Sequence, residues 1–176
     1  MRSRILTFIL VLIDWLFASI AWASFYYFRK TKIEEVEFDT NDTFYLGILV
    51  IPVLWLFIYL LQGTYQDVRR LHRSKIVGLS FVGTVIGTFC IFFIFLLDDE
   101  ISGYKQYYSV LLLLLGIHFI ATIVPRFIFV SIIVRGIHKR KSGFKTLIIG
   151  GSQKAIDIFN EISELPKGTG NLFVGF

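Results

Sequence analysis

Four long apolar runs occupy the first three-quarters of this 176-residue chain. The third run, residues 76–97, contains 22 residues without a charged side chain. A helix of that length rises about 33 Å at ~1.5 Å per residue, and the hydrocarbon core of a bilayer is about 30 Å thick. The run therefore predicts a transmembrane helix in an integral membrane protein.

The other three runs are also long and apolar enough to be transmembrane helices. They cover residues 5–28, 44–61 and 107–124, and Pro125 follows the last of them. Apolar residues make up 55% of the chain and the mean hydropathy is +0.70, which is typical of a multi-pass membrane protein. We expect a four-helix transmembrane domain over residues 1–125.

Basic residues indicate the orientation of the chain in the membrane. Twelve of the 18 lysines and arginines lie at the N-terminus, in the second connector or within residues 126–145. Because Lys and Arg accumulate on the cytoplasmic side, both termini are predicted to be cytoplasmic. The same positions account for the net charge of +5 without a nucleic-acid partner.

The first run has a second interpretation as a cleavable signal peptide. Two arginines, an apolar stretch and the Ala-Trp-Ala of residues 21–23 have the order of such a peptide. The run is long for a signal sequence, contains Asp14 and continues through Phe28, so we expect it to remain as the first helix.

Two ionisable residues lie inside the predicted helices at similar depths. Asp14 is nine residues from the inner end of the first helix, and His118 is eleven from the outer end of the fourth. Burying such a group alone costs about 2.5–3.5 kcal/mol on insertion scales. We therefore predict a hydrogen bond between Asp14 and His118 that joins the two helices, with a proton or ligand role as the alternative.

The third helix contains the small-residue motif Gly83-x-x-x-Gly87, which permits close helix approach. We favour packing within the bundle, and a homodimer is the alternative. The single cysteine, Cys90, lies in the same helix, which leaves the chain without an intrachain disulfide or a cysteine metal site. The sequence predicts no metal ligands.

Residues 126–144 are apolar at first and then strongly basic. The segment either prolongs the fourth helix past Pro125 or lies along the inner membrane surface, where each cation contributes about 1 kcal/mol on anionic headgroups. These contacts would anchor the segment to the membrane. A more specific alternative is that the segment holds a polyprenyl phosphate near the surface. The residues predicted to contact headgroups are Arg135, Lys139, Arg140 and Lys141.

The last residues, 145–176, have the pattern of a β-α-β unit. Apolar runs at 146–149 and 172–176 predict strands, and residues 153–165 have helical spacing. The turn Gly150-Gly151-Ser152 precedes that helix, whose free amides can bind phosphate, but it keeps only the first glycine of G-x-G-x-x-G. We favour a structural turn over a nucleotide site, and expect the start of a Rossmann-like domain that continues beyond residue 176.

Together these features resemble the N-terminal region of the bacterial polyprenyl-phosphate glycosylphosphotransferases, which start exopolysaccharide and O-antigen synthesis. The resemblance covers the whole chain but only about the first third of the family's architecture. The motifs that carry it are Asp14, Phe44-Tyr-Leu-Gly47, Leu97-Asp-Asp99, residues 145–152 and residues 169–176.

The resemblance implies a protein of the bacterial inner membrane that transfers a hexose-1-phosphate from a nucleoside-diphosphate sugar to undecaprenyl phosphate. In the family a C-terminal domain does this chemistry with an Asp-Glu pair and Mg²⁺. This chain has no such pair on its predicted cytoplasmic side. The resemblance therefore implies a membrane anchor and positioning region without catalytic residues.

Two alternatives remain open. The first is the N-terminal part of a membrane-bound nucleotide-sugar 4,6-dehydratase or epimerase, which a second, complete G-x-G-x-x-G and a Tyr-x-x-x-Lys pair further along would identify. The second is a stand-alone, non-enzymatic membrane scaffold, and the half-built β-α-β unit speaks against it.

Overall fold

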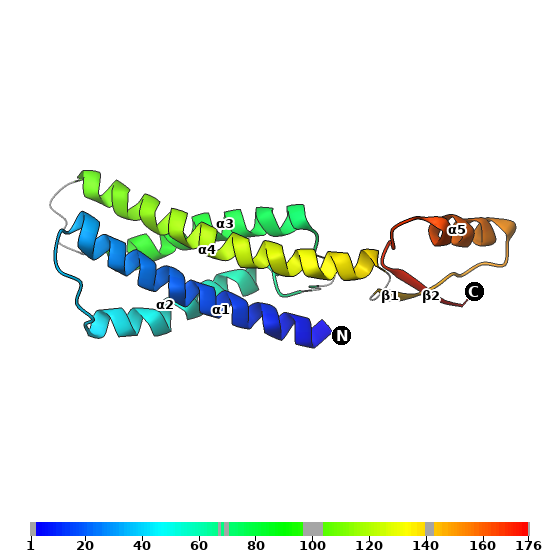
Figure 1. The fold of residues 1–176 in the computed structure, drawn as a ribbon, viewed down its shortest axis with the longest axis horizontal. Coiled ribbons are helices and arrows are strands. Elements are labelled where there is room, and N and C mark those ends of the chain that lie inside the picture. Colours follow the sequence, from blue (N-terminus) through cyan, green and yellow to red (C-terminus); the bar gives the residue numbers. More distant parts are fainter. Residues whose placement is uncertain (1–2, 67, 69–70, 97–103, 140–142, 176) are drawn as a thin grey trace. The chain divides into compact units, whose positions relative to one another are not determined.

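A computed structural model describes residues 3–66, 68, 71–96, 104–139 and 143–175. The chain divides into two compact units, one that ends at Phe129 and one that begins at Val130. We call the first the membrane unit and the second the α/β unit (Figure 1).

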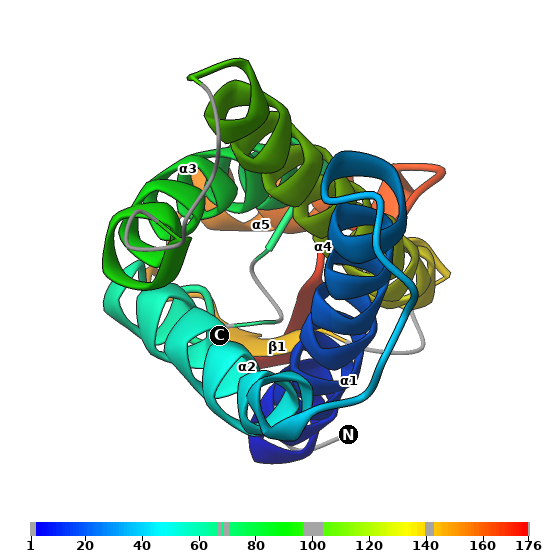
Figure 2. The same ribbon diagram turned by 90° about the vertical axis from the view of Figure 1, so that its left-hand side faces the viewer.

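Four helices form the membrane unit, the last of them with its residues up to Phe129. Their bounds are α1 (Ser3–Phe28), α2 (Asp42–Leu61), α3 (Arg73–Ile91) and α4 (Tyr104–His138). Short π-helical turns follow α1 (η1, Arg29–Ile33) and α3 (η3, Phe92–Leu96). All four helices are long and apolar enough to cross a membrane, as the four apolar runs predict. Viewed along their axes, they form a ring in chain order (Figure 2).

The start of α2 shows how sequence sets a helix boundary. Asn41 has an extended backbone, and its side chain accepts a hydrogen bond of 3.1 Å from the Phe44 amide. Such a cap satisfies one of the free amides in the first helical turn. The Tyr26 hydroxyl donates to the same Asn41 oxygen at 2.9 Å, which connects the end of α1 to the start of α2.

Pro125 does not end the fourth helix, so of the two alternatives for residues 126–144 the structure contains the first, a fourth helix prolonged past Pro125. Pro125 lies inside α4, which continues to His138 and includes Arg135. Transmembrane helices tolerate an internal proline because neighbouring groups satisfy the carbonyl that it leaves free. Lys139 follows the helix and is exposed, while Arg140 and Lys141 lie outside the described residues.

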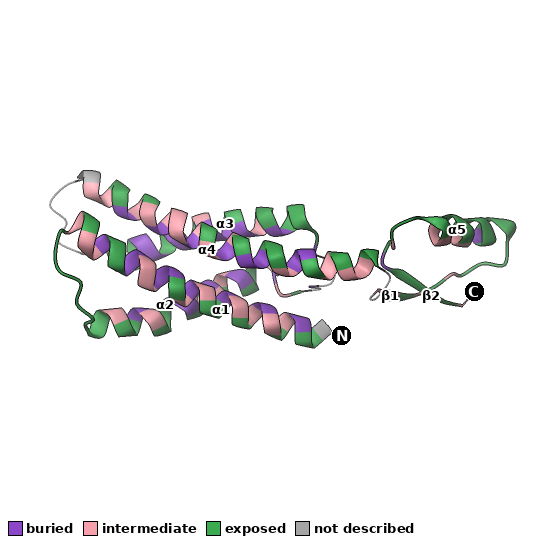
Figure 3. Ribbon diagram, viewed as in Figure 1, coloured by how far each residue is buried: buried purple, intermediate pink, exposed green. Residues whose placement is uncertain are grey.

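Aromatic and aliphatic side chains from all four helices fill the centre of the membrane unit. This core includes Trp22 of α1, Trp55 of α2, Ile91 of α3 and Leu114 of α4. Large apolar residues also cover the outside of the bundle, as a hydrocarbon surrounding requires. Buried and exposed positions alternate along each helix (Figure 3).

The α/β unit contains the predicted β-α-β arrangement. Its elements are β1 (Phe144–Leu147), α5 (Gln153–Glu164) and β2 (Asn171–Gly175), and the strands pair in parallel. β1 begins and ends two residues earlier than predicted, because its pairing with β2 stops at Leu147 and Ile149 is 92% exposed. Phe159 of α5 packs edge-on against Phe173 of β2, with ring centroids 5.2 Å apart.

Candidate functional site

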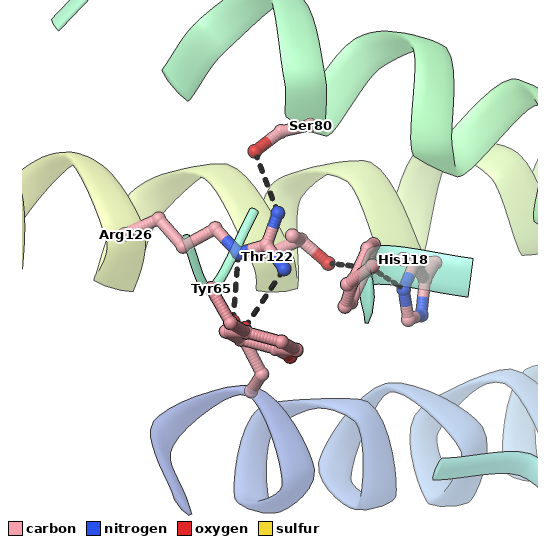
Figure 4. A network of polar contacts seen from close by, with 7 residues as sticks. Tyr65, Ser80, His118, Thr122 and Arg126 are labelled. Carbon is pink, nitrogen blue, oxygen red and sulfur yellow. Dashed lines mark hydrogen bonds and ion pairs between the residues drawn. The ribbon is translucent and has the colours of Figure 1, made fainter. Parts of the chain in front are cut away.

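A network of buried polar side chains connects the four helices of the membrane unit (Figure 4). It is the one place in the described membrane unit where an ion pair is fully enclosed. Its members are Asp14 of α1, Tyr59 of α2, Tyr65 after α2, Ser80 of α3, and His118, Thr122 and Arg126 of α4.

An ion pair between Asp14 and Arg126 forms the centre of the network. Arg126 Nε donates to Asp14 Oδ1 at 2.7 Å, and Arg126 Nη2 donates to Asp14 Oδ2 at 2.8 Å. The two side chains are 1% and 0% exposed, respectively. A planar guanidinium that binds both oxygens of a carboxylate makes the most favourable geometry available to such a pair. The pair therefore fastens α1 to α4.

Further contacts compensate the charges of this pair. Tyr65 donates its hydroxyl to Asp14 Oδ2 at 2.8 Å, and Arg126 Nη1 donates to Ser80 Oγ at 3.2 Å. The guanidinium carbon of Arg126 also lies 3.8 Å from the centroid of the Tyr59 ring, a cation–π contact. Buried charges need such partners because they have left their water of hydration.

His118 occupies the other end of the network. The Tyr59 hydroxyl lies 2.7 Å from His118 Nε2 and 3.2 Å from Thr122 Oγ1. The His118 ring stacks on Trp55 with centroids 3.5 Å apart and planes inclined by 10°. His118 is thus held by α2 from two sides.

The predicted hydrogen bond between Asp14 and His118 is wrong. The oxygens of Asp14 bind Arg126 and Tyr65, whereas His118 Nε2 faces Tyr59. A carboxylate gains more from a bidentate guanidinium than from one imidazole nitrogen, which explains the choice of partner. Asp14 does connect α1 to α4, but its partner in α4 is Arg126.

The glycine motif of α3 packs within the bundle, as favoured from the sequence. A Cβ atom at Gly87 would overlap the Trp55 ring, and one at Gly83 would lie 3.1 Å from Cε1 of Tyr59. The Trp55 ring therefore contacts the Gly87 backbone and the His118 ring. Gly83 thus lies against Tyr59 of the polar network, and Gly87 lies against Trp55, which stacks on His118.

The chemistry of the network favours a structural role. The carboxylate and the guanidinium are paired, and every member of the network except Tyr65 is buried. No cluster of three His, Cys, Asp or Glu side chains suited to a metal occurs among the described residues. A buried, satisfied network fixes helix positions instead of presenting a reactive group.

The turn at Gly150, Gly151 and Ser152 lies in the α/β unit, and all three residues are exposed. Gly150 has a φ of +146°, a conformation that favours glycine. Ser152 precedes α5 in an extended conformation, and its side chain makes no capping hydrogen bond. Phosphate binding at this turn stays a prediction.

Tyr59→Phe is expected to destabilise the membrane unit by about 1–2 kcal/mol, because it leaves His118 and Thr122 without their shared hydroxyl partner. The measurement is the free energy of unfolding in mixed micelles as SDS is added, followed by circular dichroism. Tyr45→Phe is the matched control, since Tyr45 is 57% exposed. Equal stability of the two variants would contradict a role for the Tyr59 hydroxyl.

Ionisation of the Tyr65 hydroxyl is expected to make the free energy of unfolding depend on pH in the alkaline range. Burial, and then the charge of Asp14, raises the pKa of Tyr65 well above its usual value of 10.0. In the unfolded chain the hydroxyl ionises near pH ~10, so the folded state then binds more protons and its stability falls as pH rises further. We expect Tyr65→Phe to show a smaller loss of unfolding free energy above pH ~10 than the unmodified chain. If the variant and the unmodified chain lost the same unfolding free energy over this pH range, Tyr65 would not contribute to the pH dependence.

No family model, curated protein or solved structure matches this chain. The residue pattern and the geometry are therefore the grounds on which a function is assigned.

Proposed function

We propose that this chain is the membrane anchor and positioning region of a sugar transferase. The complete protein would move a hexose-1-phosphate from a nucleoside-diphosphate sugar to undecaprenyl phosphate at the bacterial inner membrane, with both termini of this region cytoplasmic. The motifs that resemble the polyprenyl-phosphate glycosylphosphotransferases support the choice of reaction. Mg²⁺ belongs to the catalytic domain in this proposal, and a nucleotide could meet the chain at the turn of residues 150–152.

The observation that carries the anchoring role is the continuity of α4. The candidate span Gln106–His138 begins in the membrane unit, and its residues from Val130 onward belong to the α/β unit. There the backbone carbonyl of His138 accepts a hydrogen bond of 3.1 Å from the Gly168 amide. The last residues of this candidate span thus belong to the α/β unit. An anchor that keeps a domain at the membrane surface needs such a connection.

The polar network supports the same role. It fastens α1 to α4, the helix that continues into the α/β unit, by the bidentate contact of Asp14 with Arg126. Arg135 and Lys139 are exposed beyond this point, where cations favour anionic headgroups. A bundle fastened in this way is suited to anchoring the chain in the membrane.

The proposal is tested with the complete reading frame that encodes this chain. Membranes from cells that express it are supplied with a labelled nucleoside-diphosphate sugar and undecaprenyl phosphate, with and without Mg²⁺. We expect a lipid-linked sugar phosphate that depends on Mg²⁺ and on the expressed protein. A frame with a second dinucleotide motif and dehydratase activity would replace the proposal, and a frame that adds no catalytic domain would favour the scaffold.

A further inference from the structure

The connector between η1 and α2 places apolar residues among acidic ones. In residues 35–39 the apolar Val36 and Phe38 alternate with Glu35, Glu37 and Asp39. Val36 and Phe38 are nevertheless 48% and 40% exposed. Apolar side chains that stay exposed in a contiguous patch mark a contact surface. The surroundings of Val36 and Phe38 identify the partner of this surface.

The backbone at the end of η1 fixes the direction of the connector. Glu35 has a φ of +55°, the left-handed conformation in which helices commonly end. The Val36 amide donates a hydrogen bond of 3.1 Å to the Lys30 carbonyl. At the other end, Asn41 caps α2 and accepts a hydrogen bond from the Tyr26 hydroxyl. The connector is therefore held against the ends of both helices.

Ring contacts join the connector to the lipid-facing surface of the two helices. The Phe38 ring lies edge-on to Tyr27 of α1 and to Phe44 of α2, with centroids 5.4 and 5.8 Å apart. Tyr45 packs against Phe44 in the same way, with centroids 5.4 Å apart. Tyr27 and Tyr45 are 47% and 57% exposed on candidate membrane spans. Phe38 thus continues the surface that these helices expose to lipid.

The length of α2 gives the depth of Phe38 in the membrane. α2 has 20 residues and rises about 30 Å, which matches the ~30 Å hydrocarbon thickness of a bilayer. Its first residue, Asp42, is acidic and stays at the boundary between hydrocarbon and headgroups. Phe44 lies in the first turn of α2, and the Phe38 ring contacts it. Phe38 therefore lies at this boundary, where tyrosines such as Tyr45 accumulate.

We propose that Val36 and Phe38 insert into the headgroup region of the bilayer, whereas Glu37 and Asp39 face water. A spacing of two residues lets a chain without helical hydrogen bonds direct the apolar pair to one side and the carboxylates to the other. The leaflet is the one at which α1 ends, and the basic residues predict it to be the outer one. Inserted in this way, the connector holds the ends of α1 and α2 at one depth. This role does not depend on the reaction proposed for the complete protein.

Fluorescence quenching in lipid nanodiscs tests this proposal on the complete chain. Cys90→Ala removes the single cysteine, and the environment-sensitive dye NBD is then attached to one new cysteine in each variant. The variants are Val36→Cys and Phe38→Cys, with Glu37→Cys and Asp39→Cys as the matched controls. The nanodiscs contain phosphatidylcholine, a small fraction of which bears a spin label close to the headgroup. We expect the spin label to quench the dye several-fold more strongly at residues 36 and 38 than at residues 37 and 39, and iodide in the water to quench in the opposite order.

The depth of the spin label provides the second readout. A label near the end of the acyl chain is expected to quench residues 36 and 38 several-fold less than the label near the headgroup. Equal lipid quenching at all four positions would overturn the proposal. Protection of residues 36 and 38 from both quenchers would also overturn it, because protein and not lipid would then cover them. If Phe38→Cys does not fold, Val36→Cys and Glu37→Cys still give the comparison, since both residues are exposed.

Discussion

Arg126→Met is expected to destabilise the membrane unit by about 3–5 kcal/mol, as happens when one partner of a buried ion pair is removed. The substitution leaves the Asp14 carboxylate enclosed, with the Tyr65 hydroxyl as its one remaining partner among the described residues. It also removes the cation from the Tyr59 ring and the donor from Ser80. The measurement is the free energy of unfolding by SDS in mixed micelles.

Arg135→Met is the matched control for this prediction. Arg135 lies in the same helix and is exposed, so losing its charge should change the unfolding free energy by less than about 0.5 kcal/mol. If both arginine variants lost the same stability, the Asp14–Arg126 contact would not be what fastens the bundle.

Gly87→Ala is expected to cost about 1–3 kcal/mol, because the added methyl group overlaps the Trp55 ring in a packed interior. The ring would have to move away from α3, and its stacking with His118 would change. The same unfolding assay measures the loss of stability, and tryptophan fluorescence reports the displaced ring.

Two other glycines serve as controls for the Gly87 prediction. A Cβ atom at Gly78 of α3 or at Gly116 of α4 would have no neighbour within 4 Å. Alanine at these positions is expected to be neutral or to stabilise the helix by up to about 1 kcal/mol. A Gly87→Ala variant as stable as Gly78→Ala would show that α2 and α3 do not need their close contact.

The four membrane helices could be predicted because hydropathy and length act locally. About 20 apolar residues in sequence are needed to cross a bilayer, and the four runs are 18 to 24 residues long, which can be read without tertiary information. The ends were harder to place. α4 continues through Pro125, and whether a transmembrane helix tolerates an internal proline depends on its surroundings, which the run itself does not contain.

Of the ion pair at the centre of the polar network, the sequence predicts Asp14 but not its partner Arg126. The sequence identifies Asp14 as a buried charge but pairs it with His118, because it leaves open whether Arg126 belongs to the fourth helix or to a segment along the membrane surface. A signal was present, since His118, Thr122 and Arg126 are spaced by four residues and share one face of a helix. Tyr65 gave no such signal, because its contact depends on how the turn after α2 folds back.

The α/β unit illustrates a different limit. Short apolar runs predict both strands, helical spacing of apolar residues predicts the helix between them, and the structure contains all three. Strand ends depend on the pairing partner, so β1 stops where its ladder with β2 stops, at Leu147. One β-α-β unit does not distinguish a Rossmann-like domain from other parallel folds.

The most direct test of the account is a double-mutant cycle on Asp14 and Arg126. Unfolding free energies are measured for Asp14→Leu, Arg126→Met, the double variant and the unmodified chain. The account predicts that the double variant loses about 2–3 kcal/mol less unfolding free energy than the two single variants lose together. Each single change leaves an unpaired buried charge, whereas the double change removes both charges. Losses that add to within about 0.5 kcal/mol would contradict the claim that this ion pair fastens α1 to α4.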